Sequence, residues 1–123
     1  MAEYLLDTNV LSKIFYGDAR VKEFVDSPGI ETVVYIESIQ GSISKKDKQL
    51  IKKSLAQLKY YPLTSDIALS AIEMIDKYSS ANGLFLADAL IASTALSYDL
   101  VLVSYNTKHF KFIDGLTVLE PKV

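Results

Sequence analysis

The sequence predicts an α/β fold, in which a parallel sheet is flanked by helices. Short apolar runs alternate with segments whose apolar residues recur every three or four positions. The clearest run, residues 100–103, is apolar throughout, as expected of a central strand covered on both faces. Strands that alternate with helices favour parallel pairing. The 123 residues, half of them hydrophobic, are enough for one core, so we expect a single domain over residues 1–123.

The first third of the chain contains two expected strands. Residues 4–6 form an apolar run that stops at Asp7, and Pro28-Gly29 is typical of a turn. Residues 32–35 are mostly β-branched and predict the second strand. The full expectation here is a strand at 4–6, a helix at 8–15, a short helix around 21–25, a turn at 28–29, a strand at 32–35 and a short helix at 37–40.

The rest of the chain contains three expected helices and three expected strands. Ser44 can cap a long helix at about 45–59, with Leu50, Ile51, Leu55 and Leu58 on its apolar face. Thr64, Ser65 or Asp66 can cap the next helix, which ends at Asn82-Gly83 and has Ile67, Ala68, Ala71, Ile72 and Ile75 as its stripe. The other elements are an edge strand at 60–63, marked by Pro62, a helix at about 87–98, and strands at 100–103 and 117–119.

Composition excludes several classes of protein. The chain has no cysteine, which rules out disulfides, zinc–thiolate sites and thiol nucleophiles and fits a reducing compartment. The N-terminus has no basic segment and Asp7 interrupts its apolar run, so no secretory signal is expected, and no stretch is long enough to span a membrane. We therefore expect a soluble, cytoplasmic protein. A net charge of −2 argues against a nucleic-acid coat protein but not against a nuclease that contacts phosphate through a cation.

Three of the fifteen acidic residues lie in apolar surroundings, namely Asp7, Glu37 and Asp88. Burial of an unpaired carboxylate costs several kcal/mol, so such groups usually have partners. Asp7 and Glu37 follow expected strand ends, where ligands bind in open α/β sheets, and Asp88 opens a helix. Carboxylates without cysteine form a hard-oxygen site suited to Mg²⁺ or Mn²⁺, and the cation would offset their repulsion.

Each of these acids also has a purely structural explanation. Asp7 can be the N-cap of the helix at 8–15, and Asp88 in a first helical turn interacts favourably with the helix dipole. Glu37 too can favour the start of its short helix. The prediction of a metal site therefore depends on the three acids together.

Four blocks of sequence resemble the PIN-domain ribonucleases, and more closely the VapC-type toxins of toxin–antitoxin pairs. They are Leu-Leu-Asp-Thr-Asn-Val-Leu at 5–11, Val-Tyr-Ile-Glu-Ser-Ile-Gln-Gly at 34–41, Leu-Ala-Asp-Ala-Leu-Ile-Ala-Ser-Thr-Ala-Leu at 86–96 and Leu-Val-Ser-Tyr-Asn-Thr-Lys-His-Phe at 102–110. The resemblance implies a PIN-like fold with a five-stranded parallel sheet of order 3-2-1-4-5. It also implies metal-dependent hydrolysis of RNA phosphodiester bonds.

Family roles transfer to six positions. The resemblance makes Asp7, Glu37 and Asp88 metal-binding and catalytic carboxylates and Asn106 a further catalytic position, while Thr8 and Ser104 match polar positions that line the site. The implied cofactor is Mg²⁺ or Mn²⁺. The implied partners are an RNA substrate, a cognate antitoxin protein and a second copy of the chain in a homodimer.

The chain departs from the family in its fourth block. Many relatives carry a fourth acid just before the phenylalanine, where this chain has His109, and no carboxylate lies between Asp99 and Asp114. This puts a second metal ion in doubt, since neither an amide nor a neutral imidazole supplies the charge that a hard cation prefers. Asp114 is a conceivable substitute with poorly fitting spacing. His109 is the only histidine, which excludes chemistry built on a histidine pair within one chain, and we interpret it as a solvated turn residue.

Two other functions remain open. The missing fourth acid is compatible with an inactive PIN-fold module that binds RNA or a protein partner. A doubly wound phosphotransfer domain also gathers acids at strand ends, but it would need an acid pair near the first strand and a lysine after a late strand, and neither is clear. Six lysines fall between residues 45 and 59, and we favour a solvated helix face over an RNA-binding patch.

Overall fold

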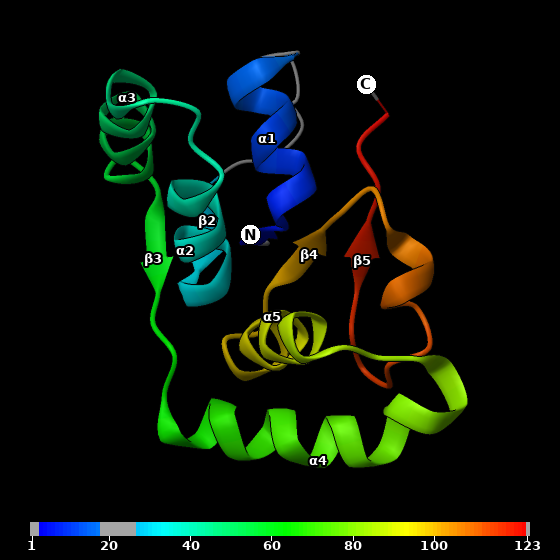
Figure 1. Ribbon diagram of the computed structural model, residues 1–123. Helices are drawn as coiled ribbons and strands as arrows, with labels where there is room; N and C mark the ends of the chain where they lie inside the picture. Colours follow the sequence, from blue (N-terminus) through cyan, green and yellow to red (C-terminus); the bar gives the residue numbers. More distant parts are fainter. Residues whose placement is uncertain (1–2, 18–26, 123) are drawn as a thin grey trace.

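Five strands form one parallel sheet in the computed structural model, which describes residues 3–17 and 27–122. The strand order is β3-β2-β1-β4-β5, which confirms the predicted fold class and sheet order, and Figure 1 shows β3 and β5 at the two edges. The short helix expected around residues 21–25 lies outside the described residues. The strands are β1 (Tyr4–Leu6), β2 (Pro28–Glu31), β3 (Lys59–Tyr61), β4 (Val101–Val103) and β5 (Val118–Leu119).

Helices connect the strands and flank the sheet. Ser44 and Thr64 cap α3 and α4 as predicted, each accepting a hydrogen bond from a backbone N–H three residues on. Gly83 ends α4 in the left-handed conformation, with φ of 69°, which costs glycine little. The helical elements are α1 (Thr8–Tyr16), α2 (Thr32–Gln40), α3 (Lys45–Leu55), α4 (Ser65–Asn82), α5 (Leu86–Ser97) and the short 3₁₀ helix η2 (Thr107–His109).

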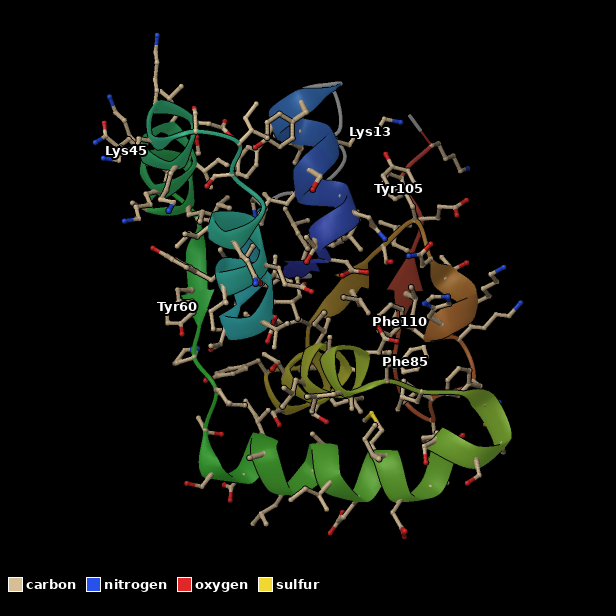
Figure 2. All side chains as sticks on the ribbon, viewed as in Figure 1. Lys13, Lys45, Tyr60, Phe85, Tyr105 and Phe110 are labelled. Atoms are coloured by element: carbon tan, nitrogen blue, oxygen red, sulfur yellow. The ribbon has the colours of Figure 1, made fainter. Side chains whose placement is uncertain are left out.

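The core covers both faces of the central strand β1 and of its neighbour β4. Leu5 and Leu6 of β1 are both buried, and so are Leu102 and Val103 of β4. Successive side chains of a strand point to opposite faces, so apolar groups pack on each face of the sheet. Phe110 is the largest fully buried side chain among the residues that the structure describes. Outside the core, the lysines of α3 are exposed, and Lys45 points away from the molecule (Figure 2), as expected of a solvated face.

The predicted position of the second strand is wrong. The strand is β2 at Pro28–Glu31, where a turn was expected, and the β-branched residues from Thr32 onward begin α2. Proline is tolerated because it is the first residue of the strand. Glu31 then caps α2, and this tertiary arrangement outweighs the β propensity of the residues that follow. Glu37 consequently lies in the second turn of α2 and not at the end of a strand.

Two helical details also differ from the prediction. The buried stripe of α4 is Ile67, Ala71, Met74 and Tyr78, and Ile72 lies off it with 66% of its surface exposed. On α3, Ile51 and Leu55 are buried, whereas Leu50 is 57% exposed. In both helices the exposed residue is adjacent in sequence to a buried one, so it points about 100° away around the helix axis. The helix α3 also ends at Leu55, because the chain must turn before β3 pairs with β2.

We predict that Gly29→Ala destabilises the protein by about 1–3 kcal/mol, the usual range for overpacking. A Cβ at this position would lie 2.3 Å from a Tyr61 ring carbon and 3.0 Å from the Lys59 carbonyl oxygen on the neighbouring strand. Urea unfolding measures the loss. Gly41→Ala is the control, since its nearest contact would be 3.3 Å and its φ of −80° suits any residue. Equal losses in the two variants would contradict the proposed clash.

Candidate functional site

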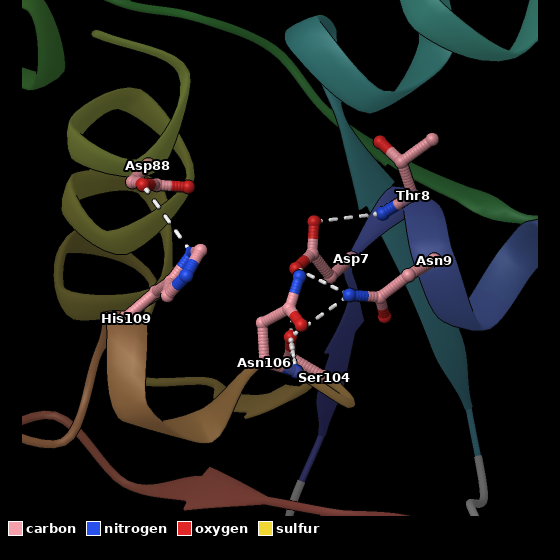
Figure 3. Close-up of polar contacts among 7 residues, drawn as sticks. All are labelled: Asp7, Thr8, Asn9, Asp88, Ser104, Asn106 and His109. Carbon is pink, nitrogen blue, oxygen red and sulfur yellow. Dashed lines mark hydrogen bonds and ion pairs between the residues drawn. The ribbon is translucent and has the colours of Figure 1, made fainter. Parts of the chain in front are cut away.

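Asp7 is the centre of the candidate site. It follows β1 and is the N-cap of α1, and its residue is only 8% exposed. Its Oδ1 accepts a hydrogen bond from the Thr8 backbone N–H at 2.8 Å, and its Oδ2 accepts one from the Ser104 hydroxyl at 2.7 Å (Figure 3). The capping role considered from the sequence is therefore real. The capping bond holds Asp7 Oδ1, while Oδ2 accepts the hydroxyl of Ser104, which follows the neighbouring strand β4.

Ser104 ties the fourth sequence block to the first. It is fully buried and follows β4, which pairs with β1. Its hydroxyl donates to Asp7 and accepts from the Asn106 backbone N–H at 3.0 Å. The Asn9 side chain joins the same group, since its Oδ1 accepts the Tyr105 N–H at 3.1 Å. The loop after β4 is thereby held against the start of α1, with the Asn106 residue exposed at its surface.

Thr8 links Asp7 to Glu37. While its backbone N–H is bound to Asp7, its hydroxyl donates to Glu37 Oε1 at 2.6 Å. Glu37 is exposed on α2. Two of the three predicted acids are therefore bridged by one residue. Thr8 therefore lies between these two acids, and its role in lining a functional site stays a prediction.

Asp88 lies on α5, and the side chain of His109 lies beside it. It occupies the first turn of α5 and accepts a hydrogen bond from the Phe85 backbone N–H. The Nδ1 atom of His109 lies 4.0 Å from Asp88 Oδ2, and the side chain of His109 is 45% exposed (Figure 3). His109 is thus partly solvated, as expected, but it also faces a predicted site acid. The sequence offered no signal for this pairing.

Burial and mutual repulsion disfavour charge on these acids. Burial raises the pKa of Asp7 above its usual range, with a smaller contribution from the negative charge of Glu37, although the Ser104 and Thr8 hydrogen bonds oppose the shift. Burial also raises the pKa of Asp88, and the nearby His109 opposes it. The negative charge of Asp7 adds to the rise in the pKa of Asp88. A bound cation would relieve this repulsion.

Sequence reasoning missed a fourth acid, Glu31. It ends β2 and caps α2, and it is 1% exposed. Burial raises its pKa to about 6, and the charges of Glu37 and Asp7 add to the shift. The strand-end rule that selected Glu37 would have selected Glu31 if β2 had been placed correctly. The misplaced strand therefore hid the most buried carboxylate among the described residues.

Asp114 does not join the site. Its Oδ2 lies 3.2 Å from Lys77 Nζ, its side chain is 87% exposed, and its backbone N–H donates to the Tyr78 hydroxyl. It therefore does not substitute for the acid that the fourth block lacks.

The donor set fits a hard divalent cation by its chemistry. Within residues 3–17 and 27–122, no three histidine, cysteine, aspartate or glutamate side chains are grouped closely enough to hold a metal ion between them. Mg²⁺, however, usually keeps several waters and uses one or two carboxylates. Asp7 and Glu37, joined through Thr8, can supply these, and Asp88 can supply a third from the facing helix. The site is a set of oxygen donors and not a completed cage.

Comparison with known proteins identifies related chains. Residues 4–116 match the family model described as PIN domain. Ribonuclease VapC10 of Mycobacterium tuberculosis is 30% identical over 118 residues, covering 91% of this chain and 89% of the relative.

Solved structures share the fold over nearly the whole chain. A toxin–antitoxin complex from Klebsiella pneumoniae contains a chain that is 27% identical, with a TM-score of 0.81 and coverage of 97% of this chain and 98% of that one. DNA-bound VapBC from Salmonella typhimurium contains a chain with a TM-score of 0.83 at 21% identity, covering 98% of both chains. Because its identity is only 21%, the match to the Salmonella chain supports the fold alone.

We predict that Ser104→Ala lowers the free energy of unfolding by about 1–3 kcal/mol at pH 7, because a buried Asp7 oxygen and the Asn106 N–H lose their partner. Ser104→Thr is the control, since it keeps the hydroxyl. Chemical denaturation measures both variants. If Ser104→Thr lowers the free energy of unfolding as much as Ser104→Ala does, the lost hydroxyl is not the cause of the destabilisation.

We predict that the Glu31 carboxyl makes stability pH-dependent. Its pKa is about 6 in the folded chain against an ordinary value of 4.5, so between these values the folded state binds more protons than the unfolded state. The free energy of unfolding should therefore fall as pH rises through this window, by about 2 kcal/mol in all. The measurement is the difference between wild type and Glu31→Gln from pH 4 to pH 7. A difference that stays constant with pH would contradict the assignment.

Proposed function

The chain belongs to the PIN-domain family, and we propose from this that it is an endoribonuclease and the toxin of a toxin–antitoxin pair. The observation that carries the proposal is the pair Asp7 and Glu37, bridged by Thr8 at the carboxyl edge of the sheet. The 30% identity to a protein named as a ribonuclease supports the reaction class, and the toxin–antitoxin complex at 27% identity supports the biological role.

We propose that Asp7, Glu37 and Asp88 hold a divalent cation, Mg²⁺ or Mn²⁺. Such an ion, when bound, polarises a phosphoryl oxygen and lowers the pKa of a coordinated water. The three acids supply hard oxygen ligands, and the raised pKa values of Asp7 and Asp88 indicate a place where positive charge is favoured.

The other residues of the site position these acids and the substrate. Ser104 fixes the orientation of Asp7, and Thr8 fixes that of Glu37. The Asn106 side chain is at the surface of the site, where its amide can donate a hydrogen bond to a phosphate oxygen. His109, held near Asp88, keeps that carboxylate facing the site.

We propose three partners: an RNA substrate, an antitoxin protein and a second copy of the chain. The neighbour from Klebsiella supports the antitoxin, because its structure is a toxin–antitoxin complex. An apolar hollow of ≈ 400 Å³, lined in part by Tyr35, Ile36 and Tyr60, offers surface for a protein contact. In the part of the chain that the structure describes, no helix has the length and apolar character needed to cross a membrane.

We predict that Asp7→Asn lowers the rate of RNA cleavage by on the order of 100-fold or more, since loss of a partner of a metal ligand alone costs 10–100-fold. Asparagine is also a good N-cap, so the fold should persist. The assay is cleavage of structured RNA with Mg²⁺ or Mn²⁺. Asp76→Asn, on the exposed face of α4, is the matched control. Equal rates of RNA cleavage by Asp7→Asn and wild type would contradict the assignment of Asp7 to the active site.

An inactive binding module is the second candidate. The absence of a completed metal-binding group among the described residues favours it. Calorimetry with Mn²⁺ separates the two functions. A wild-type protein that neither binds Mn²⁺ nor cleaves RNA, yet retains RNA or a protein partner, would be such a module.

A further inference from the structure

Glu31 is the N-cap of α2, and burying its carboxylate costs more free energy than a neutral cap would. Its Oε1 accepts the Val34 N–H at 2.6 Å, which is the N-cap bond. In the same chain Ser44 and Thr64 make this bond for α3 and α4 with a single neutral hydroxyl. A glutamate in the same role brings a charge and a second oxygen into the interior. Capping alone therefore does not account for a carboxylate at this position.

The second oxygen of Glu31 has no partner. Glu31 is 1% exposed, and its Oε2 is the one buried side-chain oxygen or nitrogen among the described residues that makes no hydrogen bond. A buried carboxylate oxygen without a partner is expensive, and carboxylates so placed usually pair with a cation or coordinate a metal.

The sheet register places Glu31 beside Asp7. Leu5 is paired with Gly29, so the same parallel register continued by two residues brings Asp7 alongside Glu31. On the other side of Asp7, the pairing of Leu6 with Val103 brings Ser104 alongside. Glu31 thus ends β2, while Asp7 and Ser104 directly follow the adjacent strands β1 and β4. The charges of Glu37 and Asp7 both act on Glu31, which agrees with this placement.

We propose that Glu31 is a fourth acidic group of the metal site, and that its free Oε2 takes part in binding a divalent cation next to Asp7. This inference rests on the proposed function. It accounts for the acid that the fourth block lacks, since residues 100–113 contain no carboxylate and Asp114 is engaged with Lys77. The fourth negative charge enters from β2, on the opposite side of Asp7 from β4.

The experiment measures metal binding without catalysis. Mn²⁺ is titrated by calorimetry into wild type, Glu31→Gln and Glu31→Ser, with Glu73→Gln on the exposed face of α4 as the matched control. Glu31→Ser keeps a hydroxyl cap of the kind used by α3 and α4 but removes the carboxylate. We expect Kd for Mn²⁺ to rise by about 10-fold or more in both Glu31 variants and to stay unchanged in the control. Circular dichroism verifies that each variant is folded.

A second measurement needs no variant. Side-chain carboxyl signals of ¹³C-labelled wild-type protein are followed by NMR as Mg²⁺ is added, and the Glu31 signal should shift together with that of Asp7. Wild-type affinity in Glu31→Ser, or a Glu31 signal that ignores Mg²⁺ while Asp7 responds, would overturn the inference and leave the proposed function standing. A wild-type protein that binds no divalent ion would overturn both.

Discussion

The hydrogen bond from Ser104 to Asp7 is the interaction on which the site depends. It joins the ends of two paired central strands, and each of these residues is also bound to the loop or helix that follows it. Asp7 thereby serves the fold and the site with different oxygens, since Oδ1 begins α1 and Oδ2 faces Ser104. A buried carboxylate at this junction is tolerable because hydrogen-bond donors surround it.

Parallel pairing explains why residues far apart in sequence meet here. With β1 between β2 and β4, the carboxyl ends of three strands lie side by side, and each end delivers one polar side chain. The helices then add acids from outside the sheet, Glu37 from α2 and Asp88 from α5. The three predicted acids and Glu31 therefore come from four separate parts of the fold, and no local segment could bring them together alone.

The sequence predicted the fold better than it predicted the individual site contacts. Alternating apolar runs predicted a parallel sheet flanked by helices, and Ser44 and Thr64 were correctly expected to cap two of these helices. The strand order came from the resemblance to the PIN-domain ribonucleases and not from the spacing of residues. Placement of the second strand failed because residues 32–35 have high β propensity, while a proline and a glycine occupy the true strand. The roles of Asp7, Glu37 and Asp88 stay predictions. The pairing of His109 with Asp88 and the burial of Glu31 arise from tertiary packing, which no spacing in the sequence encodes.

The position of the single histidine has a practical consequence. One imidazole in the whole chain gives one set of ring signals, and here that ring lies 4.0 Å from a site carboxylate while nearly half of its side chain is exposed to solvent. Its resonances are thus an intrinsic spectroscopic reporter for the charge state of Asp88. Addition of a divalent ion, or of any molecule that changes the surroundings of Asp88, can be followed from them without attaching any label.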